Sequence, residues 1–301
     1  MEQLRKFADK TLSMSSTSIK RIGGGYYADV YKLDYENTQP LIVKVYKSEN
    51  VMQDEIAQLN ILKKHSLYTM PEVIFSHIAD REYGKDFIIM NYLRGENAGN
   101  IFYLRASKRK ALGDSIIDNL IAFHRVNNTK GFGEINSDHF FSTFNEYYKI
   151  RVDRIFSMAT ELYKKKQLSD FVYNVVKEAV INFDRIFYLP ITESSLVHGD
   201  YNTWNVLADK KRCEVTAIID PCGCMWADRE YDLYQLNNAN GKHLNLFENY
   251  ASKMCLSENC CQKMAFYELF TEVEHYYKSG YPVVQKLIKS QAQNLKKYLD
   301  K

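Results

Sequence analysis

The first ninety residues show short apolar runs separated by polar turns, a pattern that is typical of β-strands. The runs are rich in Tyr, Val, Ile and Leu, and they lie at 22–33, 41–46, 75–78 and 87–90. Between the second and third runs, apolar residues recur at helical spacing and predict a helix over 51–65. The first third of the chain is therefore expected to form a β-rich unit that carries one helix.

From residue 95 onward, charged positions lie opposite long apolar stripes, which predicts amphipathic helices. A short β region interrupts them between Ser195 and Asp220. The whole pattern predicts an α+β fold of two lobes, a small β-rich lobe at 1–94 and a large, mostly helical lobe at 95–301. The hinge between them is expected near 91–95. The predicted helices of the second lobe cover 104–126, 143–166, 168–187, 229–238, 243–253, 262–278 and 283–299.

The composition is that of an ordinary globular protein, with 301 residues of which 46% are hydrophobic and 26% are charged. The formal charge of +3 is close to balance and gives no reason to expect nucleic acid or a membrane surface as a partner. No apolar run approaches the roughly 20 residues that cross a bilayer, and residues 1–10 lack the apolar core of a secretory signal. No obligate protein partner is evident.

All six cysteines lie between Cys213 and Cys261. Their spacing matches neither a secreted disulfide framework nor the paired CxxC motifs of zinc sites. The close pairs Cys222 with Cys224 and Cys260 with Cys261 leave metal binding open as an alternative. Reduced thiols in a cytoplasmic protein are the favoured interpretation.

Residues 198–205, with the sequence His-Gly-Asp-Tyr-Asn-Thr-Trp-Asn, carry the strongest chemical signal, together with an Asp that ends the next apolar strand. Asn205 follows Asp200 by five positions, and Asp220 follows Asn205 by fifteen. This set suits phosphoryl transfer, in which the protein orients a hydroxyl and holds Mg²⁺ against the phosphates. An amide and a carboxylate supply the hard oxygen ligands that Mg²⁺ prefers, and Asp200 would accept the proton of the attacking hydroxyl. The alternative is an exposed polar turn between strands.

The order and spacing of these motifs resemble the aminoglycoside phosphotransferase superfamily, which also includes fructosamine kinases, choline kinases and related small-molecule kinases. The resemblance covers most of the chain and implies a protein-kinase-like fold that uses ATP or GTP. It implies that Asp200 is the catalytic base and that Asn205 and Asp220 are the Mg²⁺ ligands. Asp232, in the sequence Tyr-Asp-Leu, matches a family position that steadies the catalytic loop. It is also a candidate for the acceptor site.

The first third of the chain supplies candidate nucleotide-binding residues. Lys44, in the predicted strand Ile-Val-Lys-Val, resembles the lysine that holds the α- and β-phosphates of the nucleotide, and Glu55 in the next helix would be its ion-pair partner. An outward-facing strand lysine and an ordinary surface glutamate are the alternatives. The resemblance also assigns contacts with the purine to Asn91 and Leu93 in the hinge.

A run of three glycines is the candidate phosphate-binding loop. Gly23, Gly24 and Gly25 are expected between strands, where they can bring backbone amides close to phosphates. The loop lacks the last glycine of the protein-kinase pattern G-x-G-x-x-G, and three glycines also make an ordinary hairpin turn.

Other departures from protein kinases point to a small acceptor. Gly199 stands where those kinases have the arginine that pairs with a phosphorylated activation loop. Only seven residues separate Asp220 from Asp228, which leaves no room for a long activation segment. The acceptor is therefore expected to be a small molecule with a hydroxyl group rather than a peptide.

The acceptor site is expected in the last third of the chain. Between Trp226 and Glu274, eight acidic residues outnumber four basic ones, and such a surface would attract polyamine sugars. Glu268, Glu272 and Glu274 are the candidate acceptor-binding carboxylates, although a solvated helix face gives the same count. Glu268 and Glu272 are four apart and share one face of the predicted helix, whereas Glu274 lies on another.

The leading hypothesis is an aminoglycoside or related antibiotic phosphotransferase. A fructosamine kinase-like sugar-amine kinase is the first alternative, because Ile219-Asp220-Pro221 and Asp228-Arg229-Glu230 resemble that branch. Against it, the catalytic loop reads Tyr-Asn-Thr-Trp where that branch has Leu-Trp-Ser-Gly. A nucleotide-binding module without catalysis is the third hypothesis, and the intact Lys44, Glu55, Asp200, Asn205 and Asp220 set argues against it.

Overall fold

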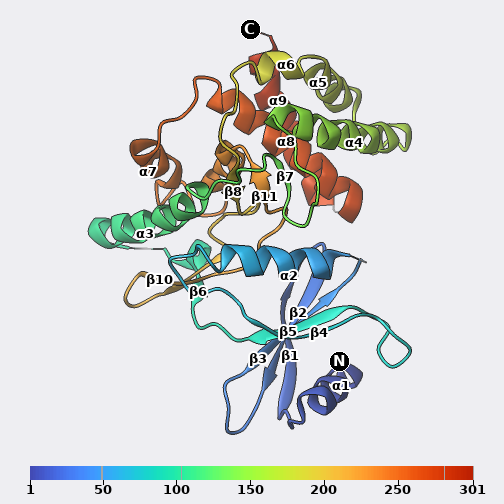
Figure 1. Ribbon diagram of the computed structural model, residues 1–301, viewed down its shortest axis with the longest axis vertical. Helices are drawn as coiled ribbons and strands as arrows, with labels where there is room; N and C mark the ends of the chain where they lie inside the picture. The colour runs from blue at the N-terminus through green and yellow to red at the C-terminus, as the bar shows by residue number, and fades with distance from the viewer. Residues whose placement is uncertain (49, 103, 281, 301) are drawn as a thin grey trace.

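A computed structural model of the protein describes residues 1–48, 50–102, 104–280 and 282–300. The chain forms a β-sheet lobe from its first third and a larger helical lobe from the rest (Figure 1). The predicted α+β, protein-kinase-like architecture is confirmed. In the described residues, no helix combines the length and the apolar character that spanning a membrane requires.

The N-terminal lobe is built on a five-stranded antiparallel sheet with the strand order β1-β2-β3-β5-β4. The predicted strand over 22–33 is in fact two strands, because the chain turns at Gly25 and pairs back on itself. Gly24 has a φ of 149°, a conformation that side-chain-bearing residues rarely adopt. The strands are β1 (Ser18–Gly24), β2 (Ala28–Asp34), β3 (Leu41–Tyr46), β4 (Val73–His77) and β5 (Phe87–Asn91).

The two faces of this sheet pack against different helices. Phe87 and Ile89 of β5 join the cluster that contains Leu4 of α1 (Glu2–Leu12). Ile88 and Met90, which alternate with them, join the cluster of α2 (Val51–Leu62). The sequence pattern did not predict α1, since only Leu4 and Ala8 of this short helix are buried.

The C-terminal lobe follows the predicted order of helices with two differences, and short strands at 96–97, 133–134 and 225–227 lie outside the predicted β region. The expected helix over 168–187 breaks into two, and the expected helix over 229–238 is a 3₁₀ segment. Two three-stranded sheets accompany the helices, in the orders β10-β9-β6 and β7-β11-β8. The elements are β6 (Glu96–Asn97), η1 (Ala98–Asn100), α3 (Ala106–His124), β7 (Gly133–Glu134), α4 (Phe144–Lys164), α5 (Asp170–Ile181), α6 (Phe183–Ile186), β8 (Ser195–Val197), β9 (Val206–Asp209), β10 (Glu214–Ile218), β11 (Met225–Ala227), η2 (Arg229–Asn237), α7 (Leu246–Lys253), α8 (Cys260–Ser279) and α9 (Pro282–Leu299).

One hydrophobic cluster extends across both lobes and supports the catalytic segments. It contains Ile88 of β5 and Leu59 of α2 together with Leu120 of α3, Val206 of β9 and Ile218 of β10. The β9 and β10 strands flank the segments that carry the predicted chemistry, and α2 lies between the sheet and the helical lobe (Figure 1). Packing around this cluster therefore fixes those segments relative to the N-terminal sheet.

Candidate active site

The predicted catalytic loop connects β8 to β9 and is held by one buried carboxylate. Asp232 in η2 is fully buried and accepts hydrogen bonds from the backbone N–H groups of His198, at 2.8 Å, and Gly199, at 2.7 Å. Its Oδ2 also lies 3.1 Å from Nε2 of His124. No surface of Asp232 is left for an acceptor in this structure. Its contacts fit the other expectation for this residue, that of steadying the loop.

A glycine is required at position 199 because the loop passes close to the segment that follows Asp220. Its φ of 84° is in the left-handed region, and a Cβ at this position would lie 2.1 Å from the carbonyl oxygen of Cys222. Burial lowers the pKa of the neighbouring His198 to about 4. His198 is therefore neutral near pH 7 and supports the loop rather than transferring protons.

Asp200 is the third residue of this loop, and its carboxylate is held by two amides. Nδ2 of Asn205 donates to Oδ2 of Asp200 at 2.8 Å, and Nδ2 of Asn202 donates to Oδ1 at 2.7 Å. Burial raises the pKa of Asp200 to about 6, and the charge of Asp220 adds to the rise, whereas the bond from Asn205 and the charge of His275 oppose it. A carboxylate with a pKa near neutrality is a stronger proton acceptor than an ordinary aspartate.

Asp220 is brought beside Asn205 by a backbone hydrogen bond, since Ile219 N donates to the Asn205 carbonyl at 2.9 Å. Its φ of 56° is in the left-handed region, which turns the chain at the end of β10. The Asp220 carboxylate contacts Nζ of Lys44 from the other lobe. Partial desolvation opposes ionisation of Asp220, whose side chain is still 52% exposed, but the charge of Lys44 and its hydrogen bond lower the pKa overall. Asp220 is therefore an anion at neutral pH.

Lys44 and Glu55 form the ion pair that the sequence predicts. Lys44 is on β3 and Glu55 on α2, and both are buried with Nζ 2.8 Å from the carboxylate. Tyr46, two positions along the strand, donates a hydrogen bond from its hydroxyl to the same carboxylate at 2.9 Å. Burial opposes protonation of Lys44, but Asp220 and Glu55 raise its pKa overall, so the lysine is a cation shared by two carboxylates.

The glycine run is only partly a loop. Gly23 and Gly24 pair with β2, and the turn itself comprises Gly25, Tyr26 and Tyr27. Gly25 N donates to the carbonyl of Ala28 at 2.9 Å, and the Gly25 carbonyl accepts from Nζ of Lys47 at 2.8 Å. These bonds hold the base of the turn in place.

Asn91 and Leu93 mark the passage between the lobes. Asn91 ends β5, and its Oδ1 accepts from the backbone N–H of Glu72 at 2.7 Å, so its side chain is committed to the sheet lobe. Leu93 is half-buried in the connection to β6. For both residues, backbone contacts with a purine stay a prediction.

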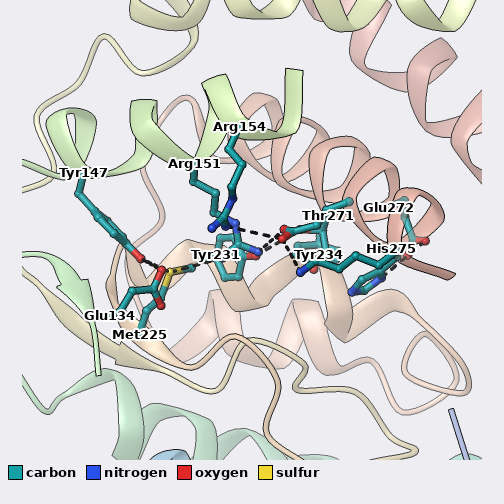
Figure 2. A network of polar contacts seen from close by, with 12 residues as sticks. Glu134, Tyr147, Arg151, Arg154, Met225, Tyr231, Tyr234, Thr271, Glu272 and His275 are labelled. Atoms are coloured by element: carbon teal, nitrogen blue, oxygen red, sulfur yellow. Dashed lines mark hydrogen bonds and ion pairs between the residues drawn. The ribbon is translucent and has the colours of Figure 1, made fainter. Parts of the chain in front are cut away.

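Two arginines of α4 point toward α8 (Figure 2). Arg151 donates to Glu274 at 2.9 Å and lies 5.7 Å from the ring centroid of Tyr231. Arg154 is 3.6 Å from the same carboxylate, and Lys278 is 2.7 Å from it. Burial opposes ionisation of Glu274, yet Arg151 and Lys278 lower its pKa to about 2. Three cations thus surround one anion.

Glu272 and His275 lie together on α8 (Figure 2). Glu272 is 3.9 Å from Nδ1 of His275, and His275 is near enough to Asp200 to act on its ionisation. Burial is the main cause that raises the pKa of Tyr234, and the charges of Asp200 and Glu272 raise it further. Glu272 therefore shares its part of α8 with His275.

Glu268, one helical turn earlier, lies in a different place. It lines a cavity of about 520 Å³ between α8 and α9, together with Gln291, Asn294 and Lys297. Burial raises the pKa of Glu268, a hydrogen bond from Gln291 opposes the rise, and the charge of Glu272 adds to it. The two carboxylates of the predicted pair therefore interact but have distinct surroundings.

Much of the acidic excess in the last third of the chain is structural. Lys263 is buried between Asp228, at 2.6 Å, and Glu230, at 2.9 Å. Asp232 binds the catalytic loop, and Glu274 is neutralised by its three cations. The expectation that the excess forms one acidic surface is therefore wrong for these four residues.

Local sequence patterns did not reveal Arg151, Tyr26 or His275 as parts of the site. Arg151 is 123 positions away from its partner Glu274, and no motif links the two. His275 could have been found, because it follows Glu268 and Glu272 on one face of the helix at i+7 and i+3. The six cysteines are all free thiols in the structure.

The comparisons with known proteins agree with this geometry. A family model described as the phosphotransferase enzyme family matches residues 18–245, which is more than half of the chain. The matched region includes both the N-terminal sheet and the catalytic segments. The chain therefore belongs to the phosphotransferase enzyme family, and it is a small-molecule kinase.

Individual relatives are distant but similar over most of their length. A protein named as a probable ketoamine kinase from Vibrio parahaemolyticus is 25% identical over 276 residues, which cover 85% of this chain and 84% of the relative. An uncharacterized Escherichia coli protein, YcbJ, is 20% identical over 285 residues, which cover 93% and 94% of the two chains. Neither identity is high enough to carry a substrate over directly.

Solved structures confirm the fold. The gentamicin complex of the aminoglycoside phosphotransferase APH(2")-IIa has a TM-score of 0.72 at 16% identity, covering 97% of this chain and 96% of the other. A thermostable mutant of the phosphotransferase APH(4)-Ia, in a ternary complex with ADP and hygromycin B, has a TM-score of 0.73 at 14% identity and covers 97% of each chain. At these identities the likeness is one of fold.

Proposed function

We propose that the protein transfers the γ-phosphate of ATP or GTP to a hydroxyl of a small polyhydroxylated amine, an aminoglycoside or related antibiotic. The observation that carries the proposal is one group of contacts: Asn205 is bonded to Asp200, its backbone carbonyl holds the chain next to Asp220, and Asp220 contacts Lys44 of the other lobe. In phosphoryl transfer, the protein has to position the reacting groups and stabilise charge. This arrangement offers a base, two oxygen ligands and a cation within one small region.

Asp200 would act as the general base. It is held by Asn205 and Asn202 at fixed geometry, and its raised pKa of about 6 still leaves it ionised at neutral pH. The acceptor hydroxyl would donate its hydrogen bond, and then its proton, to this carboxylate. The hydroxyl oxygen would form a bond with the γ-phosphorus as the bond to the leaving nucleoside diphosphate breaks.

Asn205 and Asp220 fit a magnesium ion by their chemistry. Because Nδ2 of Asn205 is committed to Asp200, its Oδ1 is the atom left to act as a ligand. Asp220 is kept anionic by Lys44 and supplies carboxylate oxygen. Both are the hard oxygen donors that Mg²⁺ prefers. When bound, the ion would neutralise phosphate charge during transfer.

Lys44 would bind the phosphates of the nucleotide, with Glu55 fixing the direction of its side chain. In this structure Lys44 also contacts Asp220, so the two lobes already meet where phosphates would lie. The backbone of Gly23, Gly24 and Gly25 would cover the phosphates, and the chain at Asn91 and Leu93 would contact the purine. Structural relatives bound to ADP support a nucleotide in this fold.

For the acceptor, Glu272 supports an amine-bearing substrate. It lies on α8 next to His275, and its side chain is 19% exposed. A carboxylate at this position can attract an ammonium group of an acceptor. Glu268 would add a more distant contact from the cavity between α8 and α9. Aminoglycoside complexes of structural relatives give further support.

A sugar-amine that also carries a carboxylate, as in a ketoamine of an amino acid, is the second candidate acceptor. The observation in its favour is the group of Arg151, Arg154 and Lys278 around the single carboxylate of Glu274, which leaves positive charge beside the site. The named ketoamine kinase relative points the same way. An acidic group on the acceptor would be attracted by this cluster.

An acceptor screen tests the proposal. The purified protein is given ATP or GTP with Mg²⁺ and one of three sets of acceptors, namely aminoglycosides, other antibiotics and glycated amino acids, and nucleoside diphosphate release is measured. Asp200→Asn serves as the matched control for contaminating kinases. Acceptor-dependent release by the wild type alone supports phosphotransfer. If an aminoglycoside is the acceptor, expression should also raise the resistance of a host to it. Location in the cytoplasm stays a prediction.

A further inference from the structure

The glycine-rich turn of the N-terminal lobe reaches across to α8 of the C-terminal lobe. The ring of Tyr26 stacks on the ring of His275, with centroids 5.6 Å apart and an angle of 28° between the planes. Next to it, Nζ of Lys278 lies 5.6 Å from the ring centroid of Tyr27. These two contacts join the lobes at a place separate from the contact between Lys44 and Asp220.

The α8 residues in these contacts also belong to the acceptor side of the site. His275 lies 3.9 Å from Glu272 and acts electrostatically on Asp200. Lys278 forms an ion pair with Glu274 at 2.7 Å. The helix that faces the catalytic base therefore also holds the tip of the turn expected to cover the phosphates.

Hydrogen bonds hold the turn at both of its ends. Gly25 N donates to the Ala28 carbonyl, Nζ of Lys47 donates to the Gly25 carbonyl, and Lys47 N donates to the Tyr27 carbonyl at 2.8 Å. Tyr26 at the tip is 38% exposed, so it is not fixed by a core. Glycine-rich segments lose much conformational freedom when they order. A contact that orders the turn before the nucleotide arrives should therefore improve binding.

We propose that Tyr26 and His275 are a positioning pair that holds the glycine-rich turn against α8, so that the phosphate-binding turn is ordered by the acceptor-side helix. The pair touches neither reacting atom, and its role rests on the proposed function of the turn as the phosphate-binding segment. Aromatic stacking contributes the attraction, and the side chain of Lys278 over Tyr27 adds a second contact. Nucleotide affinity thereby depends on a residue of the other lobe.

Hydrogen exchange tests the contact without any substrate. His275→Ala and Tyr26→Ala should each speed the exchange of the hydrogen-bonded amides of Gly25 and Lys47. His275→Phe and Tyr26→Phe keep an aromatic face and should restore protection to the wild-type level. Tyr188→Ala, which removes a tyrosine that is 54% exposed, is the matched control and should change nothing at the turn. Unchanged exchange in both alanine variants would overturn the proposal.

Titration with MgADP tests the consequence for binding. Each alanine substitution should weaken MgADP binding by about threefold to tenfold, the range expected for one aromatic pair. Because each removes the same contact, the double variant should bind no more weakly than either single variant. Phenylalanine variants should bind like the wild type. The positioning role of the pair would be refuted if the losses of MgADP affinity multiplied in the double variant. It would also be refuted if the phenylalanine variants bound MgADP as weakly as the alanine variants.

The two readouts separate this inference from the proposed function. If the wild type binds no MgADP, phosphotransfer from a nucleotide fails as a function, whereas hydrogen exchange still decides whether Tyr26 and His275 order the turn. If the wild type binds MgADP but the alanine variants match it in both exchange and affinity, the positioning pair fails and the kinase assignment stands.

Discussion

The carboxylate of Asp232 accepts the backbone N–H of Gly199 at 2.7 Å, and through this bond a buried residue of η2 fixes the loop that carries Asp200. Its second oxygen accepts from His198 N and faces His124, so the whole carboxylate is used. The loop is therefore held in place by a fully buried residue, which has no surface left for an acceptor.

Asp232→Asn is expected to lower both stability and turnover. The amide keeps one acceptor oxygen but presents an NH₂ group to one of the two loop N–H donors, which leaves a buried donor unsatisfied. Such a loss costs about 1–3 kcal/mol of the free energy of unfolding. Urea denaturation measures it, with the exposed Asp184→Asn as a control. A change below about 0.5 kcal/mol, within the range of ordinary surface substitutions, would contradict this role.

Asp200→Ala and Asp200→Asn should keep the fold and nucleotide binding but lower turnover by about two to four orders of magnitude, the usual scale of general base catalysis. Folding raises the pKa of Asp200 and so disfavours its carboxylate. In Asp200→Asn the gain from removing that carboxylate is opposed, because the new NH₂ group would face one of the two amide donors, Asn205 or Asn202, that the carboxylate accepts. Thermal melting at pH 7 checks that each variant is still folded when its turnover is measured. Turnover within about threefold of the wild type would reject Asp200 as the base.

The pH dependence follows from the pKa of about 6 for Asp200. The base works only when ionised, so kcat/KM should be level above pH 6 and fall toward tenfold per pH unit below it. Asp220 stays anionic through this window because its pKa is lowered. A pH–rate profile of the free enzyme, with stability checked at each pH, gives the measurement. If kcat/KM rises as the pH drops through 6, Asp200 does not act as a base that must be ionised.

Asp220→Asn and Asp220→Ala should abolish turnover, because the ion expected at Asn205 and Asp220 loses its charged ligand. Chelation of Mg²⁺ should do the same to the wild type and should be reversed by adding Mg²⁺. Calorimetry with ADP then shows whether Mg²⁺ still strengthens binding in the Asp220 variants. A residual rate that is independent of metal would count against the assigned mechanism.

The grouping of the candidate catalytic residues within each lobe could be predicted from the sequence, because within each lobe they lie close together along the chain. Asp200, Asn205 and Asp220 are fixed relative to one another by two strands and their turn, and spacing alone reports them. Lys44 and Glu55 likewise lie on a strand and on the helix that follows it in the sequence. For these residues, local pattern and tertiary contact coincide.

The acceptor half could not be predicted, because its contacts join segments that are distant in the sequence. The count of acidic residues could not show that Asp228 and Glu230 are bound by the buried Lys263, or that Glu274 is held by Arg151. Composition gives charge but not pairing, and pairing decides which carboxylates remain available to a ligand. The helix α1 was missed because its apolar face is short.

The acceptor itself is tested by changing the carboxylates of α8 one at a time. If the acceptor is a polycation, Glu272→Gln should raise the acceptor KM more than it lowers kcat, since charge is removed while shape is kept. Glu268→Gln should act more weakly, because Glu268 lies one turn farther along and lines the cavity between α8 and α9. The exposed Glu193→Gln, whose side chain is 58% exposed, is the matched control.

Salt then separates the two candidate acceptors. For a polycation, affinity should weaken as salt rises, because exposed charges more than about 10 Å apart are largely screened at 0.1 M. Replacing Lys278 by Gln, which removes positive charge, should leave a polycation bound at least as well as before. A ketoamine carboxylate should instead bind more weakly to this variant, because it loses one of the three cations near Glu274. A KM that is unchanged by salt and by Glu272→Gln, Glu268→Gln and Lys278→Gln would reject both charged acceptors. A neutral sugar held by hydrogen bonds and aromatic faces would then be the better acceptor.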